Sequence, residues 1–310
     1  MKTKKAGILI TAVIVIVLLF TFSLGVTAAT SSSGNETIGA IKLVPPNSAL
    51  PAGWIVVDQT ASDGKYGKVY RWKILYIGVE IKYGAKQKVL ADTPLPIGWA
   101  VVDTISKKTP LGNTLYWEIQ YLAGPQVKVG TKTNIVANTR APLRWIVTRL
   151  FTKNTAMGKV FFWEIKYVGP NPKPGAKERV PANTPLPSGW VIINSITKRE
   201  NLMDAFYWDI KYLGTNVKYG TKDRVVANTA LPAGWVAVNP VIKSGKTVYW
   251  DIKYIGGTEI KRGTKERIIA NTVIPPGWVT INLETRIRSF VTTYYWNIEY
   301  WPTRTKKTFR

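Results

Sequence analysis

The sequence predicts an all-β protein made of six tandem antiparallel repeats of about 45 residues. Three observations lead to this fold class: two series of tryptophans recur at a near-constant spacing, a strand-like hexapeptide recurs with them, and most repeats contain a similar Pro- and Gly-bearing turn. The hexapeptide YWDIKY occurs at 207–212 and again at 249–254. A period sustained six times outranks an estimate of domain number from the 310-residue length.

Twelve of the thirteen tryptophans belong to the two series, whose gaps are 45, 46, 45, 45 and 43 residues and 45, 46, 45, 42 and 46 residues. The first series is Trp54, Trp99, Trp145, Trp190, Trp235 and Trp278, and the second is Trp72, Trp117, Trp163, Trp208, Trp250 and Trp296. A six-repeat β domain is therefore expected at 38–302, with repeats at approximately 38–77, 78–124, 125–170, 171–214, 215–257 and 258–302.

Within a repeat the predicted elements keep one order. A basic segment such as 263–272 comes first and is followed by a turn such as Leu231–Gly234, where Pro second and Gly fourth favour a type I turn. The next strand opens on a tryptophan, and its apolar run at Trp190–Ile193 is typical of a strand buried on both faces. In the YWDIKY strand, aromatic and aliphatic residues alternate with charged ones, which predicts one face inward and one face outward.

A short piece at the end of each repeat, such as 215–220, is counted as a fourth strand, which gives a four-stranded antiparallel meander. Six such units favour a six-bladed propeller-like ring over a linear β stack, paired β-trefoils or tandem small β modules, which stay open. One repeat cannot bury its Trp-Ile-Tyr face alone, so neighbouring repeats are expected to shelter one another. The third repeat has Arg144 where the other five have Gly, so its turn must differ or carry a backbone cost.

The first 29 residues predict export. Three lysines among the first five residues precede an uncharged apolar run at 6–29 that ends in small residues suited to signal peptidase. The run is a hydrophobic helix long enough to span a bilayer, so it is either a cleaved signal peptide or a signal-anchor. A Ser-rich spacer follows at 30–37, and a basic tail ends the chain at 303–310. The protein is expected to be secreted or extracellular, either free or anchored in the membrane by residues 6–29.

Composition excludes several kinds of chemistry. The chain has 43 Lys+Arg against 18 Asp+Glu, a formal charge of +25, and no His or Cys. Disulfides, cysteine nucleophiles, the Ser-His-Asp triad and the usual zinc, haem and iron–sulfur ligand sets are thereby ruled out. Several acidic residues lie between two basic ones, a setting that favours the ionised form and does not suit a general acid. The chain is expected not to be an enzyme, and no catalytic residue, cofactor or metal site is predicted.

Basic residues recur in register and are the candidate polyanion-binding residues. Residues of the first series lie two positions before a Gly, and those of the second series open the basic segment. Residues of the third series lie two positions after those of the second; the second repeat has Lys88 there. The three series are Lys82, Lys128, Lys173, Lys218 and Lys261; Lys86, Lys132, Lys177, Lys222 and Lys265; and Arg179, Arg224 and Arg267. A further series lies in the hexapeptide strand at Lys166, Lys211 and Lys253. In a repeat array each series becomes a ring or ladder of charge, which is either a solvated strand face or a surface for an anionic polymer.

Aromatic residues allow two interpretations. The tryptophans recur in apolar strands at a strict period, so they are predicted to be core residues. The candidate sugar-stacking residues are the aromatic residues directly before each second tryptophan: Tyr116, Phe162, Tyr207, Tyr249 and Tyr295. Tyr83 and Tyr219 are weaker candidates.

The sequence therefore predicts an exported, strongly basic β-repeat protein of the cell surface or extracellular matrix that binds anionic envelope or matrix polymers, or glycans. The alternative is a self-assembling structural subunit, in a filament or coat, with no small ligand. Membrane contact is expected only through the N-terminal segment, nucleic acid is not the expected partner, and self-association stays open.

Overall fold

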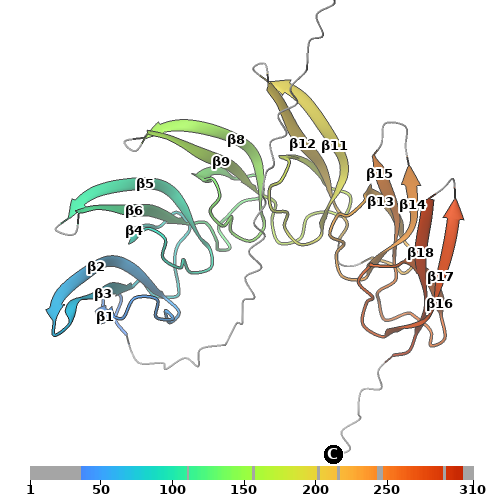
Figure 1. The fold of residues 1–310 in the computed structure, drawn as a ribbon, viewed down its shortest axis with the longest axis horizontal. Coiled ribbons are helices and arrows are strands. Elements are labelled where there is room, and N and C mark those ends of the chain that lie inside the picture. The colour runs from blue at the N-terminus through green and yellow to red at the C-terminus, as the bar shows by residue number, and fades with distance from the viewer. Residues whose placement is uncertain are drawn as a thin grey trace, which may run out of the picture. The chain divides into compact units, whose positions relative to one another are not determined.

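The computed structural model describes residues 36–109, 112–155, 158–200, 203–214, 217–242, 247–288 and 291–302. These residues form six three-stranded antiparallel sheets that follow one another in sequence order, with no helix among them (Figure 1). The all-β tandem-repeat prediction is confirmed. Closure of the six sheets into a propeller-like ring is not shown and stays a prediction.

The chain divides into two units, Met1–Asn35 and Glu36–Arg310. The predicted export segment, its hydrophobic helix and the basic tail at 303–310 lie outside the described residues, as does the predicted spacer up to Asn35. Within the part of the chain that the structure describes, no helix has the length and apolar character needed to cross a bilayer.

Each repeat contributes a short strand, then an outer strand that begins at the first tryptophan, then a central strand that carries the second tryptophan. The first three repeats contain β1 (Ile41–Val44), β2 (Trp54–Gly64) and β3 (Gly67–Tyr76); β4 (Lys86–Leu90), β5 (Trp99–Thr109) and β6 (Gly112–Tyr121); and β7 (Lys132–Val136), β8 (Trp145–Thr155) and β9 (Gly158–Tyr167). The last three contain β10 (Lys177–Pro181), β11 (Trp190–Glu200) and β12 (Met203–Tyr212); β13 (Lys222–Val226), β14 (Trp235–Ile242) and β15 (Val248–Tyr254); and β16 (Lys265–Ile269), β17 (Trp278–Arg288) and β18 (Val291–Tyr300). Every strand lies within the repeat to which the sequence assigned it.

The third strand of each repeat lies in the middle of its sheet, as in the order β10-β12-β11. The predicted four-stranded meander is therefore wrong, because the first and second strands of a repeat are not neighbours. The piece predicted as a fourth strand is a turn instead. In the fifth repeat the backbone N–H of Thr221 donates to the carbonyl of Lys218 at 3.1 Å, and Gly220 has a φ of 83°, which leaves no extended stretch to pair.

Every outer strand carries a β-bulge at the same point. In β11 the register shifts between Ile192 and Asn194, so Ile193 is the extra residue, and the other five outer strands shift at the equivalent place. A bulge bends the strand and increases its twist. The unbroken apolar run of this strand has another cause: Trp190 and Val191, whose side chains point to opposite faces, are both buried and belong to different apolar clusters, so the strand is covered on both faces as predicted. Ile192 and Ile193, next to the shift, are partly exposed.

The turn before each first tryptophan is not the predicted one. In the fifth repeat the backbone N–H of Trp235 donates to the carbonyl of Pro232 at 3.1 Å, so Pro232 is the first residue of the turn and Gly234 the third. Gly234 has a φ of 83°, as the third residue of a type II turn requires. Glycine is also needed for space, because a Cβ atom there would lie 2.5 Å from Cε2 of Tyr254.

The third repeat keeps the same turn although it has Arg144 at the glycine position. The backbone N–H of Trp145 donates to the carbonyl of Pro142 at 3.3 Å, and Arg144 has a φ of 69°. The sequence predicted either a different turn or a strained backbone at Arg144. The structure has the same turn with a left-handed Arg144, which is the strained alternative. A left-handed conformation costs a residue with a Cβ atom about 1–2 kcal/mol.

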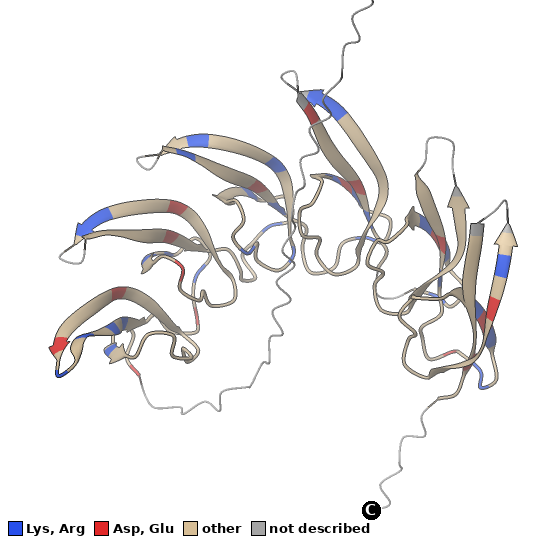
Figure 2. Ribbon diagram, in the orientation of Figure 1, with Lys and Arg blue, Asp and Glu red and all other residues tan. Residues whose placement is uncertain are grey.

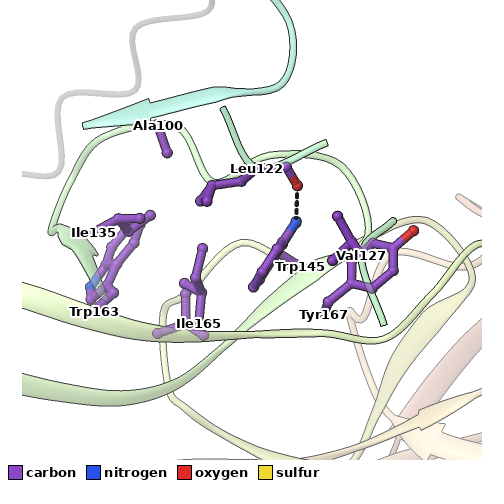
Figure 3. Packing of buried hydrophobic residues seen from close by; sticks show 9 residues of the cluster. Ala100, Leu122, Val127, Ile135, Trp145, Trp163, Ile165 and Tyr167 are labelled. Atoms are coloured by element: carbon purple, nitrogen blue, oxygen red, sulfur yellow. Dashed lines mark hydrogen bonds between the residues drawn. The ribbon is translucent and has the colours of Figure 1, made fainter. Parts of the chain in front are cut away.

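From the second repeat on, the core of each repeat is completed by the repeat before it. The contact between two consecutive repeats is termed a joint. At the joint between the second and third repeats, Ala100 and Leu122 pack against Trp145 and Ile165 (Figure 3). The indole N–H of Trp145 donates to the backbone carbonyl of Leu122 at 3.1 Å. Tryptophans of the first series are 2–6% exposed in all six repeats, which confirms that they are core residues.

Three joints also carry an ion pair between a central-strand lysine and an acid on the next short strand. The Nζ–O distances are 2.6, 2.5 and 2.5 Å, and the side chains are 12–27% exposed. The pairs are Lys166–Glu178, Lys211–Asp223 and Lys253–Glu266. These acids, which the sequence places between two basic neighbours, therefore bind a cation of the preceding repeat. The first two joints have uncharged pairs at this position, Leu75 with Gln87 and Gln120 with Thr133.

Replacing Arg144 by Gly removes the backbone cost and should raise the free energy of unfolding by about 1 kcal/mol. Urea unfolding followed by tryptophan fluorescence measures this change. The matched control is Gly189→Ala in the fourth repeat, where φ is 86° and the new Cβ atom would lie 2.4 Å from Tyr212. That variant should be destabilised, and an Arg144→Gly variant no more stable than the wild type would contradict the strained turn.

Reversing one joint ion pair tests its contribution. Lys211→Glu places two acids together at a partly buried joint and should lower stability by about 1–2 kcal/mol. The double variant Lys211→Glu/Asp223→Lys restores opposite charges and should recover most of that loss in the same unfolding assay. A double variant no more stable than the single one would show that the two side chains do not interact.

Candidate polyanion-binding surface

Five lysines occupy the same turn in the second to sixth repeats, just before the short strand. In each turn the backbone N–H three residues later donates to the lysine carbonyl at 2.9–3.1 Å, and the glycine between them has a φ of 83–90°. All five lysines are exposed. These residues, the turn lysines, are Lys82, Lys128, Lys173, Lys218 and Lys261.

None of the turn lysines forms an ion pair with a described acidic side chain. Members of the other two predicted series do form such pairs. The turn lysines are therefore the one predicted series in which every member keeps its charge available to a ligand. Figure 2 shows that Lys and Arg recur in every repeat, on the strands as well as in the turns. The fixed backbone of the turn places one such lysine at an equivalent position of five consecutive repeats.

The second predicted series lies at the start of the short strands and is largely offset by acids. Its distances to carboxylate oxygens of the same sheet are 2.7, 3.0 and 4.0 Å for the pairs Lys86–Glu118, Lys132–Glu164 and Lys265–Glu299. The other two members, Lys177 and Lys222, lie opposite Lys211 and Lys253 in the sheet register. Because a lysine stands opposite each of them, Lys177 and Lys222 have no acidic side chain directly across the sheet.

The arginine series is paired across the sheet. Nε of Arg179 lies 2.7 Å from a carboxylate oxygen of Asp209, the residue opposite it, and this hydrogen bond raises the pKa of Arg179. Arg224 and Asp251 repeat the arrangement at 2.7 Å. Arg267 lies 3.9 Å from Glu284. The arginines, like the joint lysines, are thus weaker candidates for an external anion than the turn lysines.

Three of the predicted sugar-stacking rings are buried and cannot contact a sugar. Tyr116, Phe162 and Tyr295 are 4%, 2% and 5% exposed, so their faces are not open to a sugar, and the prediction is wrong for them. Tyr116 shows the reason: its hydroxyl donates to Asp58 of the preceding repeat at 2.8 Å. Burial, with help from this hydrogen bond, raises the pKa of Tyr116 to about 12. The position before the second tryptophan belongs to the joint.

The remaining predicted rings are half-buried. Tyr207 and Tyr249 both have partners, and the hydroxyl of Tyr249 donates to Asn194 of the fourth repeat at 3.4 Å. Of the weaker candidates, Tyr83 is half-buried and the hydroxyl of Tyr219 donates to Glu266. Tyr219 therefore also lies at a joint.

The structure exposes a different aromatic series that the sequence interpretation missed. These residues lie two positions before the second tryptophan and are 43–62% exposed: Tyr70, Phe161, Phe206 and Tyr294. The period of two puts them on the same strand face as the tryptophan, which suggests a core position. They are exposed because the short strand ends here and the sheet narrows to two strands: Pro181, the last residue of β10, lies opposite Tyr207, and Phe206 is paired only with β11.

Two apolar clefts lie at joints, beside the proline-bearing turns. One of about 490 Å³ is lined by Pro142, Trp145, Pro187 and Trp190, and one of about 660 Å³ lies between the fifth and sixth repeats. The tryptophans in the first cleft are only 2% and 4% exposed. They present no open ring face, so these clefts do not replace the turn lysines as the candidate site.

Comparisons with other proteins assign no ligand to this surface. Comparison of the chain with protein-family models, curated proteins and solved structures gives no match. The described residues contain no group of three or more acidic side chains that could hold a metal ion. The functional argument therefore rests on the chain's own residues.

Competitive acetylation with a trace of acetic anhydride tests the assignment of free and paired lysines. The turn lysines should be modified faster than the joint lysines, because a paired, partly buried side chain is less accessible to the reagent. Lys218 and Lys211 form a matched comparison, since Lys218 is exposed and Lys211 is bound to Asp223. Peptide mass spectrometry of the folded chain gives both rates, and equal rates would contradict the assignment.

Proposed function

We propose that the protein is exported and binds an anionic polymer of the cell envelope or extracellular matrix through its turn lysines. The single observation that carries the proposal is the recurrence of one exposed lysine per repeat, without a described acidic partner, in five consecutive repeats. A polymer with many negative charges engages several such lysines at once. Each further contact is then intramolecular, so weak individual contacts add up to firm binding.

The charge excess supports the same function. The formal charge of +25 is what remains after all 18 acidic residues are counted, so the protein attracts polyanions over a longer range than a single contact. Whether the six sheets close into the predicted six-bladed ring or form a linear stack, the turn lysines recur once per repeat. A regular row of cations fits a polymer better than a small anion.

Exposed rings on the central strands extend the proposal to glycans. Phe161 and Phe206 are 56% and 62% exposed at equivalent positions of the third and fourth repeats. A repeated apolar side chain at the surface of a soluble domain marks an interaction surface when several lie together. In an acidic polysaccharide, the sugar rings supply apolar faces and the acid groups supply charge.

The export part of the proposal rests on the sequence of the first 29 residues. A basic head, an apolar run and small residues at its end direct a chain across the membrane. The polymer proposed as ligand is therefore one found outside the membrane. The alternative function, a self-assembling structural subunit, is favoured by one observation: the exposed apolar strand of the last repeat, considered below.

Substitution of all five turn lysines by Gln should weaken binding to long-chain polyphosphate and to a sulfated polysaccharide by at least about tenfold at moderate salt. The slope of log affinity against log salt should fall by about 3, because roughly 0.7 counterions are displaced for each contact with a flexible polyanion. Fluorescence anisotropy with labelled polymers, over a series of salt concentrations, measures both quantities.

The matched control changes the same number of charges elsewhere. Gln at the five short-strand lysines, Lys86, Lys132, Lys177, Lys222 and Lys265, gives the same net charge but leaves the turn lysines intact. This variant should lose less affinity than the turn variant. Equal losses would mean that net charge alone drives binding, and affinity independent of salt would rule out a cationic surface altogether.

A further inference from the structure

The last repeat exposes a position that every earlier repeat buries. The residue directly after the first tryptophan is 0–1% exposed in the first five repeats, where the next repeat covers it. In the sixth repeat this residue is Val279, and it is 47% exposed. The buried counterparts are Ile55, Ala100, Ile146, Val191 and Val236.

The same contrast holds for the residue that follows the central strand. Leu122 and Ile255 are both fully buried at their joints, whereas their counterpart Trp301 is 45% exposed. Two further apolar side chains of β17, Ile281 and Leu283, are 48% and 59% exposed. Since β17 is an edge strand of its sheet, the array ends in an exposed apolar edge. A terminal repeat of a free-standing array has a polar outer face instead.

The first repeat departs from the others on the complementary side. At each joint the short strand contacts the outer strand of the preceding repeat, so β1 is the strand that a preceding repeat would cover. The fourth residue of the short strand shows the difference. Val44 on β1 is only half-buried, whereas its counterparts at the joints are fully buried: Val89, Ile135, Val180, Val225 and Ile268. Both ends of the array thus present apolar side chains to solvent.

Charge at the two ends is complementary as well. Glu299 occupies the central-strand position of Lys166, Lys211 and Lys253, and Lys42 occupies the short-strand position of the acids that bind those lysines. A joint between the last and first repeats would therefore bring Glu299 opposite Lys42, which is the internal ion pair with its charges reversed. Lys42 is also bound by Glu36 yet its side chain remains 53% exposed, and the one ion-pair partner of Glu299 among the described residues is Lys265, at 4.0 Å.

The reversal also selects one pairing of repeats over others. Glu299 placed against the short strand of any of the last three repeats would meet another acid, such as Glu178, and like charges at a joint oppose docking. Glu299 fits the first repeat, where Lys42 replaces the acid. Glu299 replaces the usual lysine and Lys42 replaces the usual acid, so the two changes together restore an opposite-charge pair. This is expected if the two surfaces meet and has no explanation if both ends stay free.

We propose that the last repeat of one chain docks on the first repeat of a second copy, with β17 of the one against β1 of the other, in a joint like the internal ones. Two different surfaces meet in such a contact, so it propagates from copy to copy and gives either a closed ring of chains or a filament. In the chain itself the extensive contacts between described strands of different repeats all join consecutive repeats, and β17 stays uncovered. This interface is independent of polyanion binding.

Cross-linking of the full chain tests the proposal directly, because the chain contains no cysteine. A chain with Glu299→Cys is mixed with a chain with Lys42→Cys, and a short bismaleimide is added. Docking between copies should give a covalent heterodimer on a denaturing gel. Lys211→Cys/Asp223→Cys is the positive control for reach, since it reproduces an internal joint, and Lys211→Cys mixed with Lys42→Cys is the negative control.

The doubly substituted chain, Lys42→Cys/Glu299→Cys, shows whether β17 is covered by the first repeat of a second copy or by the first repeat of the same chain. A ladder of cross-linked oligomers is expected. A single product of monomer mass, cross-linked within one chain, would show that the first and last repeats close a ring in the same molecule and would overturn the proposal. Absence of any product, while the positive control reacts, would overturn it too.

Sedimentation of the full chain over a range of concentrations gives a second measurement. Val279→Asp should weaken self-association by about tenfold or more, since it places a charge in the centre of the apolar contact. Phe161→Asp is the matched control, an exposed apolar residue of the third repeat that lies away from both ends. Glu299→Lys should also weaken association, and Glu299→Lys/Lys42→Glu should restore it; equal effects of Val279→Asp and Phe161→Asp would contradict the interface.

Discussion

The burial of one apolar side chain per repeat, directly after the first tryptophan, holds this array together. In the first five repeats each such side chain lies under the next repeat and is at most 1% exposed, so its transfer from water stabilises two repeats at once. A buried Val or Ile contributes about 1.5–3 kcal/mol. The indole hydrogen bond to the preceding repeat and the joint ion pairs form only because this contact brings the outer strand of one repeat against the short strand of the next.

Local patterns in the sequence were sufficient to predict the number and boundaries of the repeats, but not the order of the strands within each sheet. The tryptophan period gave six units, and every strand lies within its predicted unit. The placement of the third strand in the centre, by contrast, depends on pairing between distant segments, which no local pattern records. The turn at Pro232 was misassigned because Pro and Gly occur in several turn types, and only the hydrogen bond from Trp235 shows which residue comes first.

The candidate site was predicted in part, because exposure depends on neighbours that the sequence does not identify. Four series of cations looked equivalent, but the sheet register places Arg179 opposite Asp209 and a joint places Lys211 beside Asp223. Of the four series, only that of Lys218 has no member in an ion pair with a described acid. Similarly, Tyr116 was predicted to be a surface ring, and the adjoining repeat buries it, whereas Phe206, which the sequence analysis did not single out, is exposed where the sheet narrows.

The last three joints share one chemistry, since each combines an apolar contact with a lysine–carboxylate pair of the same orientation. A gene coding for such a chain can gain or lose a whole copy in this region by unequal recombination without creating a mismatched neighbour. The first two joints lack the pair, so exchanges there would leave a lone charge. Copy number is therefore freer to vary toward the carboxyl-terminal half, which would lengthen or shorten the row of surface lysines one step at a time.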